Sequence, residues 1–135
     1  MTIVKKNDFV EFIYENNVLI METLKPTPTD EEWKFTKETL LSFYTNAFEK
    51  KYKFSLIFNL KDFYMTDIKK IRDWGELFTN NRETNKQVLT KSVLITDNIF
   101  FRYVLNMVLS VYPTSKPIKI VASLEEALEF INSHL

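Results

Sequence analysis

The feature that most constrains the fold is the alternation of short apolar runs with longer segments of helical periodicity. In the run "YKFSLIFNL", residues 52–60, apolar side chains alternate, as expected of a strand covered on at least one face. Similar strand-like runs occupy residues 8–15, 18–24, 92–95 and 117–122. Helical spacing occupies about twenty residues after Thr29, then residues 67–82, 98–111 and a final segment after Ser123.

This order, β-β-α-β-α-β-α-β-α, predicts an α/β domain. Strands that alternate with helices form a largely parallel sheet through crossover connections, and two strands in succession form an antiparallel hairpin. We therefore expect a single domain over residues 1–135, with about five strands, four helices and an N-terminal hairpin.

Local signals mark the element boundaries. Asn16-Asn17 tolerates the positive φ angles of a tight hairpin turn. Thr29 and Glu32 have the spacing of a capping box at the start of the first helix. Asp97 is the expected cap of the helix over 98–111.

The last helix has a start signal of its own. Ser123 is followed three residues later by Glu126, which again is the spacing of a capping box.

Composition narrows the classes of function. Eighteen basic residues balance eighteen acidic ones, which removes the electrostatic argument for general binding to nucleic acid or to membrane surfaces. The N-terminus has no apolar signal core, and Arg102 and Asn106 interrupt the most apolar segment, so membrane insertion is not expected. The absence of cysteine fits a reducing compartment, and we expect a cytoplasmic protein.

The residues that catalysis usually requires are scarce. The single glycine, Gly75, cannot form a glycine-rich phosphate loop or a dinucleotide fingerprint. The single histidine, His134, lies next to the C-terminus, and neither a catalytic triad nor a metal motif can be written around it. We therefore predict a protein that is not an enzyme and needs no cofactor or metal.

The segment "NLKDFYMTDI", residues 59–68, joins a buried strand to a helix. In one interpretation Thr66 caps the helix and Asp67 complements its positive end. In the other, the loop is a binding site, because ligands of open α/β sheets dock at the carboxyl ends of parallel strands. Its candidate residues are Asn59, Lys61, Asp62, Thr66 and Asp67.

The helix over 98–111 carries two apolar stripes, although a helix that packs on a sheet needs only one. The second stripe is covered either by neighbouring helices of the same domain or by a partner. One stripe comprises Phe101, Val104, Leu105, Val108 and Tyr112; the other, a candidate interface for a homodimer or another protein, comprises Phe100, Tyr103, Met107 and Val111.

Basic residues also gather on and beyond the helix over 67–82, with two aromatic residues among them. Trp74 and Phe78 share the apolar face of this helix with Ile71, which directs them inward and away from nucleic-acid bases. A solvated basic face is therefore favoured over nucleic-acid binding. The basic residues are Lys69, Lys70, Arg72, Arg82, Lys86 and Lys91.

The element order and two local sequences resemble the STAS domain (sulfate transporter and anti-sigma factor antagonist), especially its SpoIIAA-like branch. Residues 92–131, "SVLITDNIFFRYVLNMVLSVYPTSKPIKIVASLEEALEFI", resemble that branch's strand, helix, strand and acidic helix start. "LIFNLKDFYMTDI" stands where the family has a hydrophobic strand and a loop that ends in Asp-Ser-Ser-Gly.

In anti-sigma factor antagonists the first serine of that loop is phosphorylated. At the corresponding positions this chain has Thr66, Asp67, Ile68 and Lys69 in place of Asp-Ser-Ser-Gly. Because Asp67 replaces the phosphorylated serine, the resemblance implies an interaction module without phosphoregulation of this serine position.

We therefore predict a non-catalytic protein-interaction or regulatory module. The alternative is a domain that binds a small molecule or lipid between the sheet and a mobile helix, since the branch also resembles in part the lipid-binding CRAL-TRIO fold. A third alternative is an enzyme that uses Asp62 or Asp67. An interaction module should expose an apolar helix face, whereas a ligand binder should enclose an aromatic-lined pocket of several hundred Å³.

Overall fold

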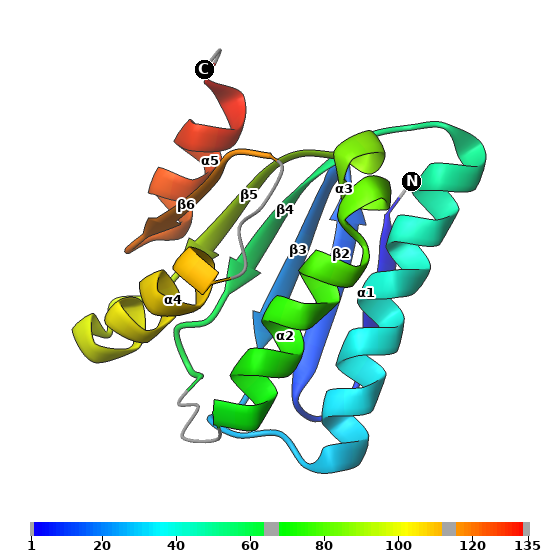
Figure 1. The fold of residues 1–135 in the computed structure, drawn as a ribbon. Coiled ribbons are helices and arrows are strands. Elements are labelled where there is room, and N and C mark those ends of the chain that lie inside the picture. The colour runs from blue at the N-terminus through cyan, green and yellow to red at the C-terminus, as the bar shows by residue number, and fades with distance from the viewer. Residues whose placement is uncertain (1, 64–67, 112–115, 134–135) are drawn as a thin grey trace.

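The structure is a computed structural model that describes residues 2–63, 68–111 and 116–133. Its centre is one sheet whose six strands lie in the order of the sequence (Figure 1). The strands are β1 (Ile3–Lys6), β2 (Val10–Glu15), β3 (Val18–Thr23), β4 (Phe54–Asn59), β5 (Leu89–Ile95) and β6 (Ile118–Val121).

Helices connect and cover these strands. Four of them pack on one face of the sheet and the fifth packs on the opposite face. In the described part of the chain they are α1 (Asp30–Lys50), α2 (Ile68–Asn80), α3 (Arg82–Val88), α4 (Ile99–Val111) and α5 (Leu124–Asn132).

The pairing of neighbouring strands changes from antiparallel to parallel at β3. Strands β1, β2 and β3 pair antiparallel, whereas β3, β4, β5 and β6 pair parallel. The expectation of an α/β domain with a mostly parallel sheet and an N-terminal hairpin is confirmed. The hairpin turn uses Asn16 and Asn17, with φ angles of 54° and 62°, as the sequence predicts.

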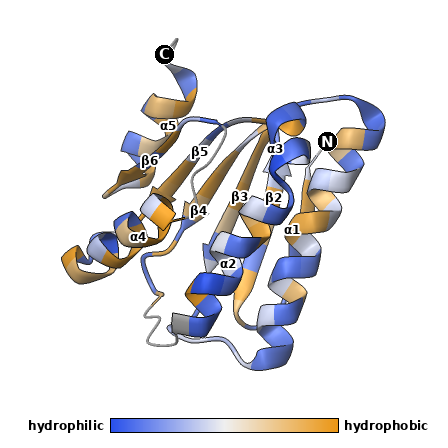
Figure 2. Cartoon of the chain, in the orientation of Figure 1, coloured by the Kyte–Doolittle hydropathy of each residue, from blue (hydrophilic) through white to orange (hydrophobic). Residues whose placement is uncertain are grey.

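Two apolar cores lie on the two faces of the sheet. Strands β4 and β5, in the interior of the sheet, are coloured mainly as hydrophobic in Figure 2, as expected of strands that are covered on both faces. The larger core lies beneath α1, α2, α3 and α4 and receives Phe54, Leu56 and Phe58 from β4. The smaller core lies beneath α5 and receives Ile57 from the same strand. Successive side chains of a strand point to opposite faces, so β4 contributes to both cores and is buried throughout its apolar length.

The structure has one strand and one helix more than we predicted. Strand β1 was missed because its sequence, "IVKK", is short and half lysine, which is common for an edge strand. The helix predicted over 67–82 ends at Asn80. Asn81, at φ −110° and ψ 24°, separates it from the short helix α3. Strand β5 begins at Leu89, three residues earlier than predicted.

Two of the predicted helix caps are present and one was wrong. In the capping box of α1, Thr29 Oγ1 accepts from Glu32 N at 3.2 Å and Glu32 Oε1 accepts from Thr29 N at 2.8 Å. At α5, Ser123 Oγ accepts from the backbone N–H of the third helical residue, as predicted. The cap of α4 is Asn98, whose Oδ1 accepts from Phe101 N at 3.0 Å. Asp97 lies one residue too early to reach that donor.

Candidate functional site

The polar loop that follows β4 does not gather its candidate residues into a pocket within the described segment. Asn59 ends β4, and its Oδ1 accepts from the backbone N–H of Lys61 at 3.3 Å. Lys61 and Asp62 are exposed on the turn. Thr66 and Asp67 lie outside the described residues.

The apolar residues of this loop have a clearer role. Leu60 and Phe63 are both 6 % exposed, and both line a cavity between the sheet and the helices α1, α2 and α4. The polar residues between them point to solvent. Leu60 and Phe63 therefore form part of the wall of an apolar cavity.

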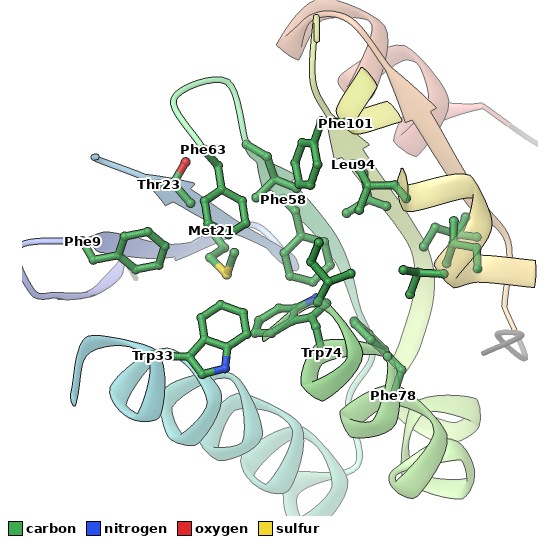
Figure 3. Close-up of a pocket in the computed structure, with 17 residues that line it drawn as sticks. Phe9, Met21, Thr23, Trp33, Phe58, Phe63, Trp74, Phe78, Leu94 and Phe101 are labelled. Atoms are coloured by element: carbon green, nitrogen blue, oxygen red, sulfur yellow. The ribbon is translucent and has the colours of Figure 1, made fainter. Parts of the chain in front are cut away.

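Aromatic rings from segments far apart in the sequence surround this cavity (Figure 3). The Phe63 ring lies edge-on between those of Phe9 and Phe101, with centroid distances of 5.7 and 5.6 Å. On the opposite side the rings of Trp33 and Trp74 lie 5.3 Å apart. Edge-to-face and tilted ring pairs of this kind stabilise a core beyond the area that they bury.

The cavity measures about 60 Å³ and is almost entirely apolar. Among the described lining residues, Thr23 alone has a side-chain oxygen, and its hydroxyl donates to the carbonyl of Asn59 at 3.3 Å. The Trp33 indole N–H, which belongs to another lining residue, donates to Asp73. The volume is well below the several hundred Å³ expected of a preformed small-molecule pocket.

The outer face of α4 is the second candidate site. All four residues of the predicted interface are exposed, and the structure adds Ile99 to them. Of the inner stripe, Phe101 and Leu105 are buried in the larger core and Val104 and Val108 pack against it, whereas Tyr112 lies outside the described residues. The exposed fractions are 86 % for Ile99, 75 % for Phe100, 64 % for Tyr103, 53 % for Met107 and 68 % for Val111.

The position of α5 explains why this face is open. Helix α5 packs through Ala127 on the opposite side of the sheet, so it does not cover α4. On its own face α4 contacts α2, on the side of the inner stripe. The outer stripe of α4 therefore has no covering element in the described part of the chain.

Lys91 does not belong to the exposed basic face that the sequence indicates. Lys91 is 6 % exposed, and its ammonium donates to the Phe130 carbonyl, the Ser133 carbonyl and the Ser133 hydroxyl over 2.7 to 2.9 Å. It ties β5 to the end of α5. The prediction that Trp74 and Phe78 point inward is confirmed, since both line the cavity.

The described residues hold no group of three histidine, aspartate or glutamate side chains that could bind a metal ion. Within the same residues, no helix combines the length and the apolar character that a bilayer span requires.

Comparison with known proteins finds one informative likeness. No protein-family model matches the chain, and no curated protein matches it. A crystal structure from Shewanella loihica PV-4, described as an uncharacterized protein of the DUF3478 family with a SpoIIAA-like fold, superimposes with a TM-score of 0.58. The alignment covers 96 % of this chain and 91 % of that chain, at 10 % sequence identity. The chain has a SpoIIAA-like fold. At this identity the SpoIIAA-like neighbour shares the fold alone, so the site must be argued from this chain's own residues.

Sequence reasoning missed the cavity. Its key rings, Phe9, Trp33, Phe63 and Phe101, come from four separate segments, and none belongs to a local motif. The available signal was the aromatic content of 15 %, which indicates a ring-rich core but does not place a cavity in it.

Proposed function

We propose that this protein is a non-catalytic interaction module that pairs with a second copy of itself through the outer face of α4. The observation that carries the proposal is the continuous exposure of Ile99, Phe100, Tyr103, Met107 and Val111 on this one helix.

The size of the face supports a protein interface. A fully accessible side chain of this kind presents roughly 150–250 Å², so the exposed fractions correspond to on the order of 700 Å². The largest apolar patch of a typical monomer covers roughly 300–600 Å², and one side of a standard interface buries roughly 800 Å². The exposed apolar area of the α4 face is thus larger than that of the largest apolar patch on a typical monomer, and it is close to the area that one subunit buries in a standard interface.

The chemistry of the face favours a second copy over a charged partner. None of the five side chains is charged, and the chain as a whole has a formal net charge of zero, so two copies do not repel each other. A single helix face that is apolar along its length is complementary to itself when two copies meet across a two-fold axis. Tyr103 and Phe100 would then be the aromatic anchors of the interface, and Met107 would fill irregular gaps.

The proposal is tested with Tyr103→Glu, which places a charge in the middle of the face. Phe48→Glu is the matched control, because Phe48 is a 47 % exposed aromatic residue on α1, away from α4. Sedimentation equilibrium and native mass spectrometry should show a dimer for the wild type and for Phe48→Glu. Tyr103→Glu should be a folded monomer, with the circular dichroism of the wild type.

Two results would overturn the proposal. A wild-type protein that stays monomeric at the highest concentration reached would show that α4 is not a self-interface. A Tyr103→Glu variant that remains dimeric would place the interface elsewhere.

The cavity favours a second candidate function, the binding of a small apolar ligand. It is lined by aromatic and aliphatic side chains, and the Thr23 hydroxyl in its described lining is already hydrogen-bonded. At about 60 Å³ it is smaller than the roughly 150 Å³ engineered cavity known to bind benzene, so a ligand of that size would have to displace α2 or α4. Native mass spectrometry separates the two functions: a retained small-molecule mass supports the ligand, and a bare dimer supports the interface.

A further inference from the structure

The sheet is covered on both faces along only part of its width. On the face opposite α1, α2, α3 and α4, the helix α5 packs against β4, β5 and β6 (Figure 1). Within the described residues no helix covers β1 and β2 on that face, and Val18 and Ile20 of β3 lie at the border of the smaller core. We call the uncovered area, which is the α5 side of β1, β2 and β3, the open half-sheet.

An apolar row crosses the open half-sheet. The register places Val4 opposite Ile13 and Ile13 opposite Ile20. Ile20 in turn lies opposite Ile57, which is buried beneath α5. Val4 is 54 % exposed, and Ile13 and Ile20 are partly exposed. A sheet face that meets only water usually carries polar side chains, so this row departs from the pattern of a solvated face.

One flank of α5 continues this apolar surface. The ammonium groups of Lys91 and Lys119 lie 5.0 and 5.6 Å from the centre of the Phe130 ring, which places Phe130 on the flank of α5 toward β6. Because a helix turns by about 100° per residue, Leu128 lies on the opposite flank, toward β3, and Leu124 lies one turn before it. Leu124 is 40 % exposed and Leu128 is 39 % exposed.

The open half-sheet has the width of one helix. Neighbouring strands lie roughly 4.8 Å apart, so β1 and β3 are separated by roughly 10 Å. An α-helix with its side chains is roughly 10–12 Å wide. A helix laid beside α5 would therefore cover the apolar row and would also contact Leu124 and Leu128.

The charges beside the row indicate what such a helix carries. Glu11 and Glu22 lie directly opposite each other and flank the apolar row, and neither forms an ion pair with a described residue. Like charges directly opposite each other destabilise a sheet. Lys6, opposite Glu11 on the edge strand, can offset one carboxylate, whereas Glu22 has only Glu11 and Asn59 as its neighbours in register.

We propose that the open half-sheet is a docking site for an amphipathic helix of a partner protein, with lysine or arginine beside an aliphatic stripe. The stripe covers the apolar row, and the basic side chains pair with Glu11 and Glu22. A second copy of this chain, docked through the same surface, would bring four glutamates together, so the charges favour a different, basic partner. The site lies on the face of the sheet opposite α4 and does not depend on dimerisation.

The probe is a synthetic helical peptide of leucine and lysine with one apolar face. About fourteen residues give a helix roughly 21 Å long, which matches the roughly 20 Å of a six-residue strand such as β2 or β3. The control peptide has glutamate in place of every lysine. Fluorescence anisotropy of the labelled peptides should show that the lysine peptide binds the full chain at least about tenfold more tightly than the glutamate peptide.

Two double variants with the same net charge locate the site. Glu11→Lys/Glu22→Lys should weaken binding of the lysine peptide at least about tenfold, because two attractions become repulsions. Glu49→Lys/Glu76→Lys changes exposed positions on α1 and α2, on the other face of the sheet, and should leave the affinity within about twofold of the wild type.

A single variant separates docking from folding. Glu22→Lys removes the opposed like charges, so it should raise the midpoint of urea unfolding of the free protein while it weakens binding of the lysine peptide. Chemical-shift mapping with the lysine peptide should show changes at Ile13, Ile20 and Leu128. No binding of the lysine peptide, equal binding of both peptides, equal loss in both double variants, or shifts confined to α4 would each overturn the proposal.

Discussion

The Trp33 indole Nε1–H donates to Asp73 Oδ2 over 3.2 Å and so joins α1 to α2. The same carboxylate oxygen accepts from Lys37 Nζ at 2.9 Å. This hydrogen bond from Lys37 is the main cause that lowers the pKa of Asp73 below its ordinary value of 3.8; the indole donor adds to it, and partial burial opposes both. Asp73 is therefore a charged link between α1 and α2.

The contribution of the Asp73 carboxylate to the free energy of unfolding should decrease as the pH is lowered. Because the pKa of Asp73 is lower in the folded state than in the unfolded state, the ionised carboxylate stabilises the fold above the unfolded pKa. That stabilisation should be lost as the pH falls from about 5 through the lowered folded pKa. Asp73→Asn should thus lower the free energy of unfolding at pH 7. The difference between the variant and the wild type should decrease as the pH is lowered toward about 2. Urea unfolding at several pH values measures this, and an effect that did not change with pH would contradict it.

Tyr44 is fully buried against Phe54, and its hydroxyl has no hydrogen-bond partner among the residues that the structure describes. Burial raises the pKa of this hydroxyl, which stays neutral at physiological pH. Because a buried hydroxyl without a partner costs free energy, Tyr44→Phe should be neutral or should stabilise the fold, by up to about 1 kcal/mol.

The control for this change is Tyr52→Phe. The Tyr52 hydroxyl accepts from the Asn46 side chain at 2.8 Å, so its removal should lower the free energy of unfolding by about 0.5–1.5 kcal/mol. Guanidinium unfolding curves of the two variants should therefore shift in opposite directions. Equal destabilisation by both would show that Tyr44 has a partner in solution.

Lys91 connects β5 to the end of α5 through hydrogen bonds. Its buried ammonium donates to two carbonyls and one hydroxyl at the end of α5, and lies 5.0 Å from the centre of the Phe130 ring. Lys91→Met keeps the methylene packing but removes all three hydrogen bonds, and should lower the free energy of unfolding by about 1–3 kcal/mol. Hydrogen exchange should show that protection is lost first in α5. Lys53→Met, at an exposed position, should change stability by less than about 0.5 kcal/mol.

The sequence predicts the helices and strands of this fold better than it predicts which of their faces are covered by other elements. The period of apolar residues identifies α4 and both of its stripes, because that period is local. Whether the outer stripe is covered depends on where α5 packs, and Ala127 places α5 on the opposite face. No residue of α4 carries that information.

The cavity was unpredictable for a related reason. Trp33 and Trp74 are forty-one positions apart in the sequence, and their contact exists only after α1 and α2 pack on the same face of the sheet. In the described part of the loop after β4, the residue that reaches the core is Phe63, and the exposed polar residues before it give no sign of that burial.

Gly75 offers a direct test of the cavity. It is the only glycine of the chain, it lies inside α2, and it lines the cavity without a positive φ angle, so alanine can adopt the same backbone conformation. Gly75→Ala should raise the free energy of unfolding by about 1–1.5 kcal/mol, since alanine gains helix propensity and adds one buried methyl group. Gly75→Ser is the control, because it restricts the backbone similarly but places a hydroxyl against apolar side chains, and it should stabilise less. Urea unfolding measures both variants. A destabilised Gly75→Ala would mean that α2 approaches the sheet too closely at this position for a methyl group, and the space beside it could not then accept a ligand without movement of the helix.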